Sequence, residues 1–510
     1  MFEINKKGPS FQNSAASDAG SDRKLRVQTR YIRRSFPVRI LLGRTAARPL
    51  FLLQRAGTTA ACLATVVLSC IVTSMGGGST PVLRDGPEHQ EKSCTLYVAP
   101  NGSKGNSGKS SASAITLLRA AARAIAGDVV CIEPGTYFLA STFSPAHSGN
   151  ANAWIVFTRY GAGAVNIVWT ASAHASDKTM IHMYNAKFPD GPSYIEFKGL
   201  TLDGRNIAEN GFFCQGSHHL RYIQNTVINQ GSSGIGSVLC DYQTADHNVV
   251  YHNGYHGGWS SGISYNSSQW FDTYTGFHNI VSNNVVVGSY DNSSNHSDGN
   301  GVIMDLSVRS YDPVTANTPP ALIVNNVVYG NGGRCIESYV VTNIWVVNNT
   351  CYDNGLDLAL GSIGSITSNN SSNEYFINNV VQTWNHEPPF MVTGKVQTRL
   401  VFSHNLVYGA NNSGISDRNP SDFLVANPMF VNPPVFSLTA GGQHALALKP
   451  ALLGNGLHLR PGSLGIGFGI DPVSLVVGNS ALKTDMSMYI YSDITGTARP
   501  HGGHFNLGAY

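Results

Sequence analysis

Charged side chains are scarce in this chain. They make up 12% of its 510 residues, about half the share of an ordinary globular protein. Lysine is scarce in the repeat region, where Lys395 is the only one between residues 199 and 427. Residues 1–58 hold 12 of the 33 Lys and Arg and 3 of the 30 Asp and Glu, which leaves 21 basic and 27 acidic residues in the rest. Because neutralising phosphates requires a clustered basic surface, this composition argues against nucleic acid as a partner.

Two structural patterns are also missing. No stretch beyond about residue 130 repeats its apolar residues with a helical period, and Asn-Gly or Asp-Gly turns are too few to join antiparallel hairpins. A mainly helical protein and an antiparallel sandwich are therefore both disfavoured. What replaces them is a surplus of asparagine and serine together with 54 glycines, which is typical of many short strands and tight turns.

A short phrase recurs instead: an asparagine, a pair of apolar and mostly β-branched residues, and then a small or polar residue before Gly or Asn. The asparagine of this phrase falls at Asn225, Asn248, Asn284, Asn326, Asn349, Asn379 and Asn405. The steps of 23, 36, 42, 23, 30 and 26 residues fit a basic unit with loop insertions, which is the signature of a solenoid. We expect the asparagine amides to hydrogen-bond between successive coils, and the corner to tolerate left-handed backbone conformations.

The N-terminal region reads as an export signal. Residues 59–75 are uncharged and mostly apolar, and they follow a stretch rich in arginine. This pattern predicts a signal peptide or signal anchor over residues 59–78, with everything after it outside the cytoplasm: secreted, periplasmic or membrane-anchored. A segment of 17 uncharged residues is at the short limit for a membrane span, so a cleaved peptide and a retained anchor both remain open.

Six cysteines follow the signal, an even number that permits disulfides in an exported chain. None has Cys-x-x-Cys spacing, which disfavours zinc and redox chemistry. We predict a Cys94–Cys131 disulfide, because each residue lies on a short strand at the start of the domain. Buried free thiols are the alternative.

Two end segments carry a family resemblance. The segment Tyr97–Tyr137 resembles the start of pectate-lyase-like proteins, with a strand, a Gly/Ser-rich loop, a capping helix and then "GD…PGTY". The last 18 residues are similar to the terminal segment of right-handed β-helix repeat proteins, with Asn506 where that pattern has Asp. His296–Asp305 and Asn325–Glu337 resemble a subgroup of such proteins. The resemblance implies an all-β, right-handed parallel β-helix; the superfamily includes lyases, hydrolases, epimerases and adhesins.

These signals divide the chain into five parts. Residues 1–58 form a basic tail, 59–78 the signal or anchor, 79–94 a linker, 95–427 the β-helix and 428–510 an irregular closing segment. A capping helix is expected over 116–126, with Leu117, Leu118, Ala121 and Ile125 on its apolar side. We expect a monomer.

One outer face gathers the few charges of the repeat region. Aligning the strands that follow each asparagine phrase places Ile235, Ile263, Val302 and Cys335 at one inward position. Alternation then sends Ser264, Asp305, Arg334 and Ser338 outward, with Asp298 at the turn before them. A slip of one residue exposes Glu337 instead.

These residues suit two reactions. The lyases of this fold remove a proton next to a uronate carboxylate, using Arg or Lys as base and calcium held by Asp to stabilise charge. Here Arg334 would be the base or charge stabiliser, and Asp298 and Asp305 the calcium ligands. A glycoside hydrolase would use two carboxylates, Asp298 with Asp305 or Asp305 with Glu337. An ordinary turn with a surface ion pair is the alternative without chemistry.

Aromatic residues concentrate in the insertion beside this face. Aromatic rings stack on sugar rings, so we predict that they bind substrate; a loop that packs its own aromatic residues is the alternative. The predicted substrate-binding residues are Tyr255, His256, Trp259, Tyr265 and Trp270. His218, His219 and His296 are interpreted as turn or surface residues. The predicted partner is a polysaccharide, and a lyase is favoured over a hydrolase or a non-catalytic binding protein.

Overall fold

The computed structural model describes residues 93–256, 259–306, 317–394, 398–411, 419, 421–435 and 456–510. The predicted tail and signal, and nearly all of the linker, lie outside these residues. Within them, no helix has both the length and the apolar character needed to span a membrane.

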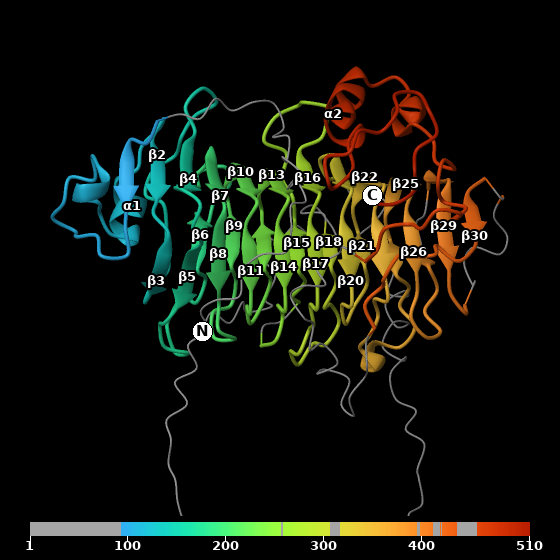
Figure 1. The fold of residues 1–510 in the computed structure, drawn as a ribbon, viewed down its shortest axis with the longest axis horizontal. Coiled ribbons are helices and arrows are strands. Elements are labelled where there is room, and N and C mark those ends of the chain that lie inside the picture. Colours follow the sequence, from blue (N-terminus) through green and yellow to red (C-terminus); the bar gives the residue numbers. More distant parts are fainter. Residues whose placement is uncertain are drawn as a thin grey trace, which may run out of the picture. The chain divides into compact units, whose positions relative to one another are not determined.

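The chain winds into coils that each contribute a strand to up to three parallel sheets, A, B and C (Figure 1). Sheet A contains β1 (Leu96–Val98), β2 (Val129–Ile132), β4 (Ile155–Arg159), β7 (Ile195–Lys198), β10 (His218–Ile223), β13 (Asp241–Asp246), β16 (Asn279–Ser282), β19 (Ala321–Val324), β22 (Thr342–Val347), β25 (Ser372–Ile377) and β28 (Leu400–Ser403). Sheet B contains β3 (Gly135–Leu139), β5 (Val165–Trp169), β8 (Leu200–Asp203), β11 (Thr226–Ile228), β14 (Val249–Tyr251), β17 (Val285–Val287), β20 (Val327–Tyr329), β23 (Thr350–Tyr352), β26 (Val380–Gln382), β29 (Asn405–Tyr408) and β30 (Phe423–Val425). Sheet C contains β6 (Ile181–Tyr184), β9 (Phe212–Gln215), β12 (Ile235–Val238), β15 (Ile263–Asn266), β18 (Val302–Asp305), β21 (Ile336–Tyr339), β24 (Ile366–Asn369) and β27 (Phe390–Thr393).

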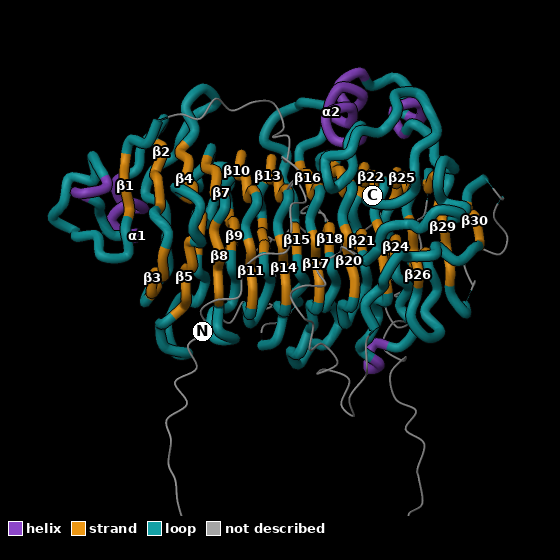
Figure 2. Tube along the Cα trace, in the orientation of Figure 1, coloured by secondary structure: helices purple, strands orange, loops and turns teal. Residues whose placement is uncertain are grey.

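Each strand pairs in parallel with the strand of the coil before it and of the coil after it, as β11 does with β8 and β14. Short strands alternate with turns around every coil (Figure 2). The fold is therefore the expected right-handed parallel β-helix, since parallel crossover connections are almost always right-handed.

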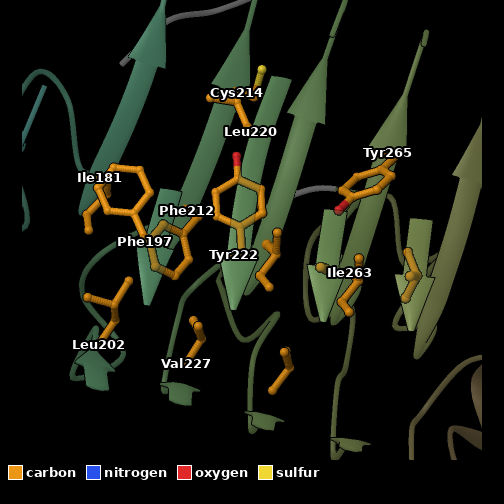
Figure 3. Packing of buried hydrophobic residues seen from close by; sticks show 14 of the residues in the cluster. Ile181, Phe197, Leu202, Phe212, Cys214, Leu220, Tyr222, Val227, Ile263 and Tyr265 are labelled. Carbon is orange, nitrogen blue, oxygen red and sulfur yellow. The ribbon is translucent and has the colours of Figure 1, made fainter. Parts of the chain in front are cut away.

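The interior is filled by side chains from alternate positions of the strands. Phe157, Phe197 and Tyr222 stack across successive coils of sheet A, with ring centroids 5.2 Å and 6.5 Å apart. Phe212 of sheet C packs against Tyr222, and Val227 of sheet B points into the same interior (Figure 3). Alternation within each strand thus produces one continuous apolar core.

The recurrent asparagines form a buried ladder at the turn between sheets A and B. The side-chain oxygen of Asn349 accepts from the backbone and side-chain N–H groups of Asn326, at 3.0 and 2.9 Å. The side chain of Asn349 donates in turn to Asn379. The same pattern joins all seven residues from Asn225 to Asn405. The left-handed conformation belongs to the preceding residue, such as Asn348 with φ of 54°. The predicted ladder is confirmed. The hydrogen bonds between coils and the left-handed conformation belong to two adjacent residues, however, and not to one.

Three disulfides join the six described cysteines. The predicted Cys94–Cys131 bond is present, and it links β2 to Cys94, which lies two residues before β1 and not on a strand as predicted. The other two are Cys214–Cys240 and Cys335–Cys351. The alternative of buried free thiols is therefore wrong.

The helix before the first complete coil is shorter than predicted. It is α1 (Leu117–Arg123), and the Thr116 hydroxyl caps it by accepting from the backbone N–H of Arg119. Leu117, Ala120 and Ala121 are buried. Leu118 and Ile125 are exposed, so their predicted place on the apolar side is wrong. Besides α1, the short 3₁₀ turns are η1 (Ser111–Ser113), η2 (Leu358–Leu360) and η4 (Pro472–Leu475).

The described part of the closing segment lies along the side of the solenoid. Helix α2 (Ser480–Ile490) packs Met486 and Ile490 against the outer face of sheet A (Figure 1). Leu507 and Ala509 pack against the outer face of sheet B. Asp485 of α2 accepts hydrogen bonds from the Phe277 backbone and the Tyr274 hydroxyl. The segment thus covers sheets A and B.

Asn349→Ala should lower the free energy of unfolding by about 3 kcal/mol. The substitution leaves the two Asn326 N–H groups that point at Asn349 without an acceptor and removes one hydrogen bond to the Ile323 carbonyl, and each unsatisfied buried donor costs about 1–3 kcal/mol. Urea unfolding measures the change, and Asn152→Ala at an exposed position is the control. Equal stability of the two variants would show that the ladder does not hold the coils together.

A buried carboxyl group makes stability depend on pH. Glu374 of β25 points inward and is fully buried, and the Ser338 and Ser368 hydroxyls donate to it. Burial raises its pKa to about 7, although these hydrogen bonds oppose the rise.

Because the folded pKa lies above the unfolded value, the contribution of Glu374 to stability is complete below about pH 4.5 and disappears as pH rises through 7. The loss should amount to about 3 kcal/mol. Glu374→Gln should remove this part of the pH dependence and be the more stable form at pH 8.5, as measured by urea unfolding at pH 5 and 8.5. Parallel pH profiles for both proteins would contradict this account of Glu374.

Candidate active site

The register of sheet C decides which residues face outward. Val302 pairs with Ile336, so the predicted alignment of Val302 with Cys335 is wrong by one residue. Cys335 instead precedes the strand and forms a disulfide. As a result, Glu337 lies on the outer face, while Ser338 points inward to Glu374. The prediction of an outward Ser338 fails because the strand of this coil begins one residue later than its sequence alignment suggested.

Arg334 and Glu337 form an ion pair on this face. Nη1 of Arg334 lies 3.1 Å from Oε2 of Glu337, and both side chains are largely buried. Nη1 also lies 3.4 Å from the Ser297 carbonyl oxygen. The Asn300 side chain donates to the same Glu337 oxygen at 3.0 Å and accepts from the backbone N–H of Arg334. Asn300 therefore fixes both members of the ion pair.

Asp305 is the last residue of β18, and its side chain lies on the outer face of sheet C. The Asn266 side chain on the neighbouring strand β15 donates to its carboxylate at 2.7 Å, because these two residues are in register. Burial raises the pKa of Asp305 to about 7; the Asn266 hydrogen bond opposes the rise, and the charge of Glu337 adds to it.

Asp298 has the most strongly raised pKa of this group. Burial raises it to about 8, and the negative charges of Glu337, Asp305 and Asp291 contribute further. Burial raises the pKa of Glu337 as well, although Arg334 and two asparagine side chains lower it. Asp298, Asp305 and Glu337 thus lie close enough to influence each other's ionisation. The structure brings all four predicted catalytic residues into one cluster.

The loop before β18 positions Asp298. The carboxylate of Asp291 accepts from the backbone N–H groups of Ser293, Ser297 and Asp298. Gly333 on the next coil packs closely beneath this loop, because a Cβ there would lie 2.3 Å from the Asp298 carbonyl oxygen. Both contacts restrict where Asp298 can lie.

Chemically, the cluster offers two kinds of group. Asp298 and Asp305 exchange protons near neutral pH, as general acids and bases do. Arg334 supplies positive charge for an anionic group of a substrate. Among the described residues, however, no three His, Cys, Asp or Glu side chains are arranged to hold a metal ion. The two predicted ligands, Asp298 and Asp305, therefore do not form a complete calcium site, since calcium takes six to eight oxygens.

The predicted substrate-binding aromatic residues do not form one wall. Tyr265 is 1% exposed and belongs to the core (Figure 3), so its predicted role is wrong. Tyr255, His256 and Trp259 lie on the connection between β14 and β15, where Tyr255 packs against His252. Trp270 lies at the other end of β15, on the connection to sheet A, and donates to the Asn317 carbonyl. Side-chain alternation along β15 places Tyr265 in the core. The strand itself lies between Trp259 and Trp270 and keeps them apart.

The three histidines differ in environment. His218 is buried and stacks on Phe271, with ring centroids 3.8 Å apart, so it is not a surface residue. His219 stacks between Tyr194 and Tyr242 and has φ of 53°, but it belongs to strand β10, so its interpretation as a turn residue is wrong. Nε2 of His296 lies 2.8 Å from Asp357.

Sequence reasoning missed the residues that position the cluster. Asn266 lies 39 residues from Asp305 in the sequence, and Asn300 lies 37 residues from Glu337. Asp291 is only seven residues from Asp298, but it lies in a turn that looks ordinary in the sequence. The signal that could have found Asn266 is register, because it occupies on β15 the position of Asp305 on β18.

Comparisons with known proteins give partial matches, and no family model matches the chain. It is 29% identical over 147 residues to the uncharacterized protein YwoF of Bacillus subtilis (strain 168), covering 27% of this chain and 31% of that protein. It is 24% identical over 332 residues to pectate lyase L of Dickeya chrysanthemi, covering 56% of this chain and 70% of that enzyme. The crystal structure of pectate lyase Pel9A superposes with a TM-score of 0.44 at 18% identity, covering 81% of this chain and 95% of that one. The chain, whose three parallel sheets form a right-handed parallel β-helix, is similar in sequence to a pectate lyase.

Proposed function

We propose that the protein is an exported polysaccharide lyase that cleaves an acidic polysaccharide by β-elimination on the outer face of sheet C. The observation that carries the proposal is the cluster in which Arg334 pairs with Glu337, and the charge of Glu337 acts on Asp298 and Asp305, two carboxyl groups of raised pKa. The similarity to pectate lyase L supports it.

The two aspartates suit the acid and base of the reaction. Their pKa values are raised to about 7 for Asp305 and about 8 for Asp298. Between these values Asp305 is mainly ionised and Asp298 mainly protonated. Asp305 would therefore remove the proton next to the uronate carboxylate, and the electron pair forms a double bond as the adjacent glycosidic C–O bond breaks. Asp298 would donate a proton to the departing oxygen.

Arg334 suits charge stabilisation better than proton removal. It already pairs with Glu337, and a guanidinium does not give up its proton in a protein. Its side chain keeps 14% of its surface exposed, and a guanidinium binds carboxylate groups through charge-assisted hydrogen bonds. Arg334 would therefore stabilise the negative charge that develops on the uronate carboxylate.

A rise in absorbance near 235 nm on uronate polymers such as polygalacturonate or alginate should accompany cleavage. Asp305→Asn and Arg334→Ala should each slow it by about 10²–10⁴-fold. The surface variant Asp190→Asn, which affects only an exposed ion pair with Lys187, is the control. The rate should rise as pH increases through about 7 and fall above about 8, as Asp305 and then Asp298 ionise.

Other outcomes would overturn the lyase. New reducing ends without absorbance would indicate hydrolysis, and binding without cleavage would indicate a non-catalytic polysaccharide-binding protein.

A glycoside hydrolase is the second candidate. It is favoured by the carboxyl groups themselves, because the pKa of Asp298 is raised to about 8, which suits a general acid, and Asp305 and Glu337 supply a second carboxyl group nearby. In that reaction Asp298 would protonate the glycosidic oxygen. The rate would also rise through about pH 7 and fall above about pH 8. The product therefore decides between the two.

Calcium binding at Asp298 and Asp305 is a separate proposal for the same two residues, in which both carboxylates are ionised and Asp298 does not donate the proton. Its support is the mutual repulsion that helps to raise the pKa of Asp298, which a divalent cation would relieve. Oxygens other than the two carboxylates would have to complete the site. Calorimetric titration with CaCl₂ should show binding that Asp298→Asn weakens and Asp190→Asn leaves unchanged. The absence of binding heat, or equal binding by both variants, would reject calcium at this site.

Export is supported by the three disulfides, which persist in oxidising compartments. The signal or anchor over residues 59–78 and the monomeric state remain predictions.

A further inference from the structure

A pocket of about 250 Å³ lies away from the carboxylate cluster, between the outer face of sheet A and the closing segment. Sheet A contributes residues of β22 and β25, and the start of α2 contributes Leu482. The connection from sheet C adds Trp270. Trp270 was predicted to bind substrate beside the carboxylate cluster, but it lies at this pocket instead.

Aromatic rings form one side of this pocket. Trp345 and Tyr375 occupy neighbouring positions in register on β22 and β25. Their rings stack 3.7 Å apart at an angle of 6°. Trp345 is only 3% exposed and Tyr375 is half-buried, so Tyr375 is supported from behind by a buried ring. Such a fixed ring provides a flat apolar surface without loss of side-chain freedom on binding.

Amide groups lie beside the rings. The Asn373 side chain donates to the Asn343 side-chain oxygen, and the Tyr375 hydroxyl lies 3.5 Å from the Asn373 oxygen. The Asn343 amide donates to the Thr318 carbonyl. These bonds hold both amides in place at the edge of the aromatic surface, where each retains acceptor capacity.

No Asp, Glu, Lys, Arg or His side chain is among the described residues that line the pocket. A uronate would therefore meet no cation there, in contrast to Arg334 on sheet C. Fixed aromatic faces bordered by amides suit a ligand that is apolar on one side and hydroxylated at its edges. A neutral sugar ring has these properties, and the volume is of the right order for one ring.

We propose that this pocket binds a neutral sugar residue, as a carbohydrate-binding site separate from the carboxylate cluster of sheet C. Trp270 and Tyr375 supply the stacking surfaces, and Asn343 and Asn373 contact hydroxyl groups. The proposal does not rest on the lyase reaction, since the two sites share no residue.

The test uses the complete chain and three neutral disaccharides, lactose, cellobiose and xylobiose, each up to 20 mM, with trigalacturonate as the charged comparison. Isothermal calorimetry should detect binding of at least one neutral disaccharide, and tryptophan fluorescence should change with the same affinity. Trp270→Ala and Tyr375→Ala should each weaken this binding about tenfold, as expected for loss of a stacking ring. Tyr408→Ala, which removes an exposed tyrosine from sheet B, is the matched control and should bind normally.

Trp270→Phe keeps a ring and should retain most of the affinity, which separates stacking from misfolding. Asp305→Asn should slow cleavage of the acidic polymer by about 10²–10⁴-fold but leave neutral disaccharide binding intact, so failure of one site is distinguishable from failure of the other. No binding of any of the three disaccharides, or unchanged binding by Trp270→Ala and Tyr375→Ala, would overturn the proposal.

Discussion

The hydrogen-bonded asparagine ladder fixes the height at which each coil lies on the next. Buried amides such as those of Asn284, Asn326 and Asn349 bond both to a side chain of an adjacent coil and to backbone carbonyls. A slip of one residue would break several buried bonds at once, and each carries the cost of an unsatisfied polar group. Because the ladder runs through seven coils, it holds in register the strands that carry the carboxylate cluster.

That register brings distant residues together on sheet C. Asn266 contacts Asp305 across 39 residues, and Asn300 contacts Glu337 across 37. Because the chain has few charges, the negative charge of three carboxyl groups is balanced mainly by Arg334, which pairs with Glu337. Burial and mutual repulsion consequently raise the pKa values of Asp298 and Asp305 toward neutrality. The register of the solenoid therefore brings the carboxyl groups together, and the low number of charges contributes to their raised pKa values.

The periodic part of the molecule could be predicted from sequence, because local chemistry repeats there. Recurrent asparagine phrases predicted the coils and the ladder, and strand positions predicted the disulfide at Cys94. The predicted site residues Asp298, Asp305, Arg334 and Glu337 lie together, since all four belong to neighbouring coils.

What failed depended on single residues within a coil. The strand after Arg334 begins one residue later than its alignment suggested, which reversed the orientation of Ser338 and Glu337. Tyr265 was assigned to a binding loop, although alternation on β15 places it in the core. Trp270 and Trp259 are close in sequence, yet an intervening strand separates them. These errors arise because a solenoid tolerates insertions between strands, so sequence spacing does not determine on which side of a strand a residue falls.

The described closing segment also shapes the molecule. By packing on sheets A and B it buries apolar residues that a solenoid would otherwise expose, and it completes the aromatic pocket beside Trp270. The carboxylate cluster lies on the remaining sheet. A charged face and a neutral pocket on different sheets would let one chain contact two kinds of sugar.

The most direct test of the central claim is a crystal structure of the Asp305→Asn variant with a bound uronate oligosaccharide. We expect the sugar on the outer face of sheet C, with a uronate carboxylate at Arg334 and a glycosidic oxygen near Asp298. An oligosaccharide bound on sheet A or B, with no contact to Arg334 or Asp298, would contradict it.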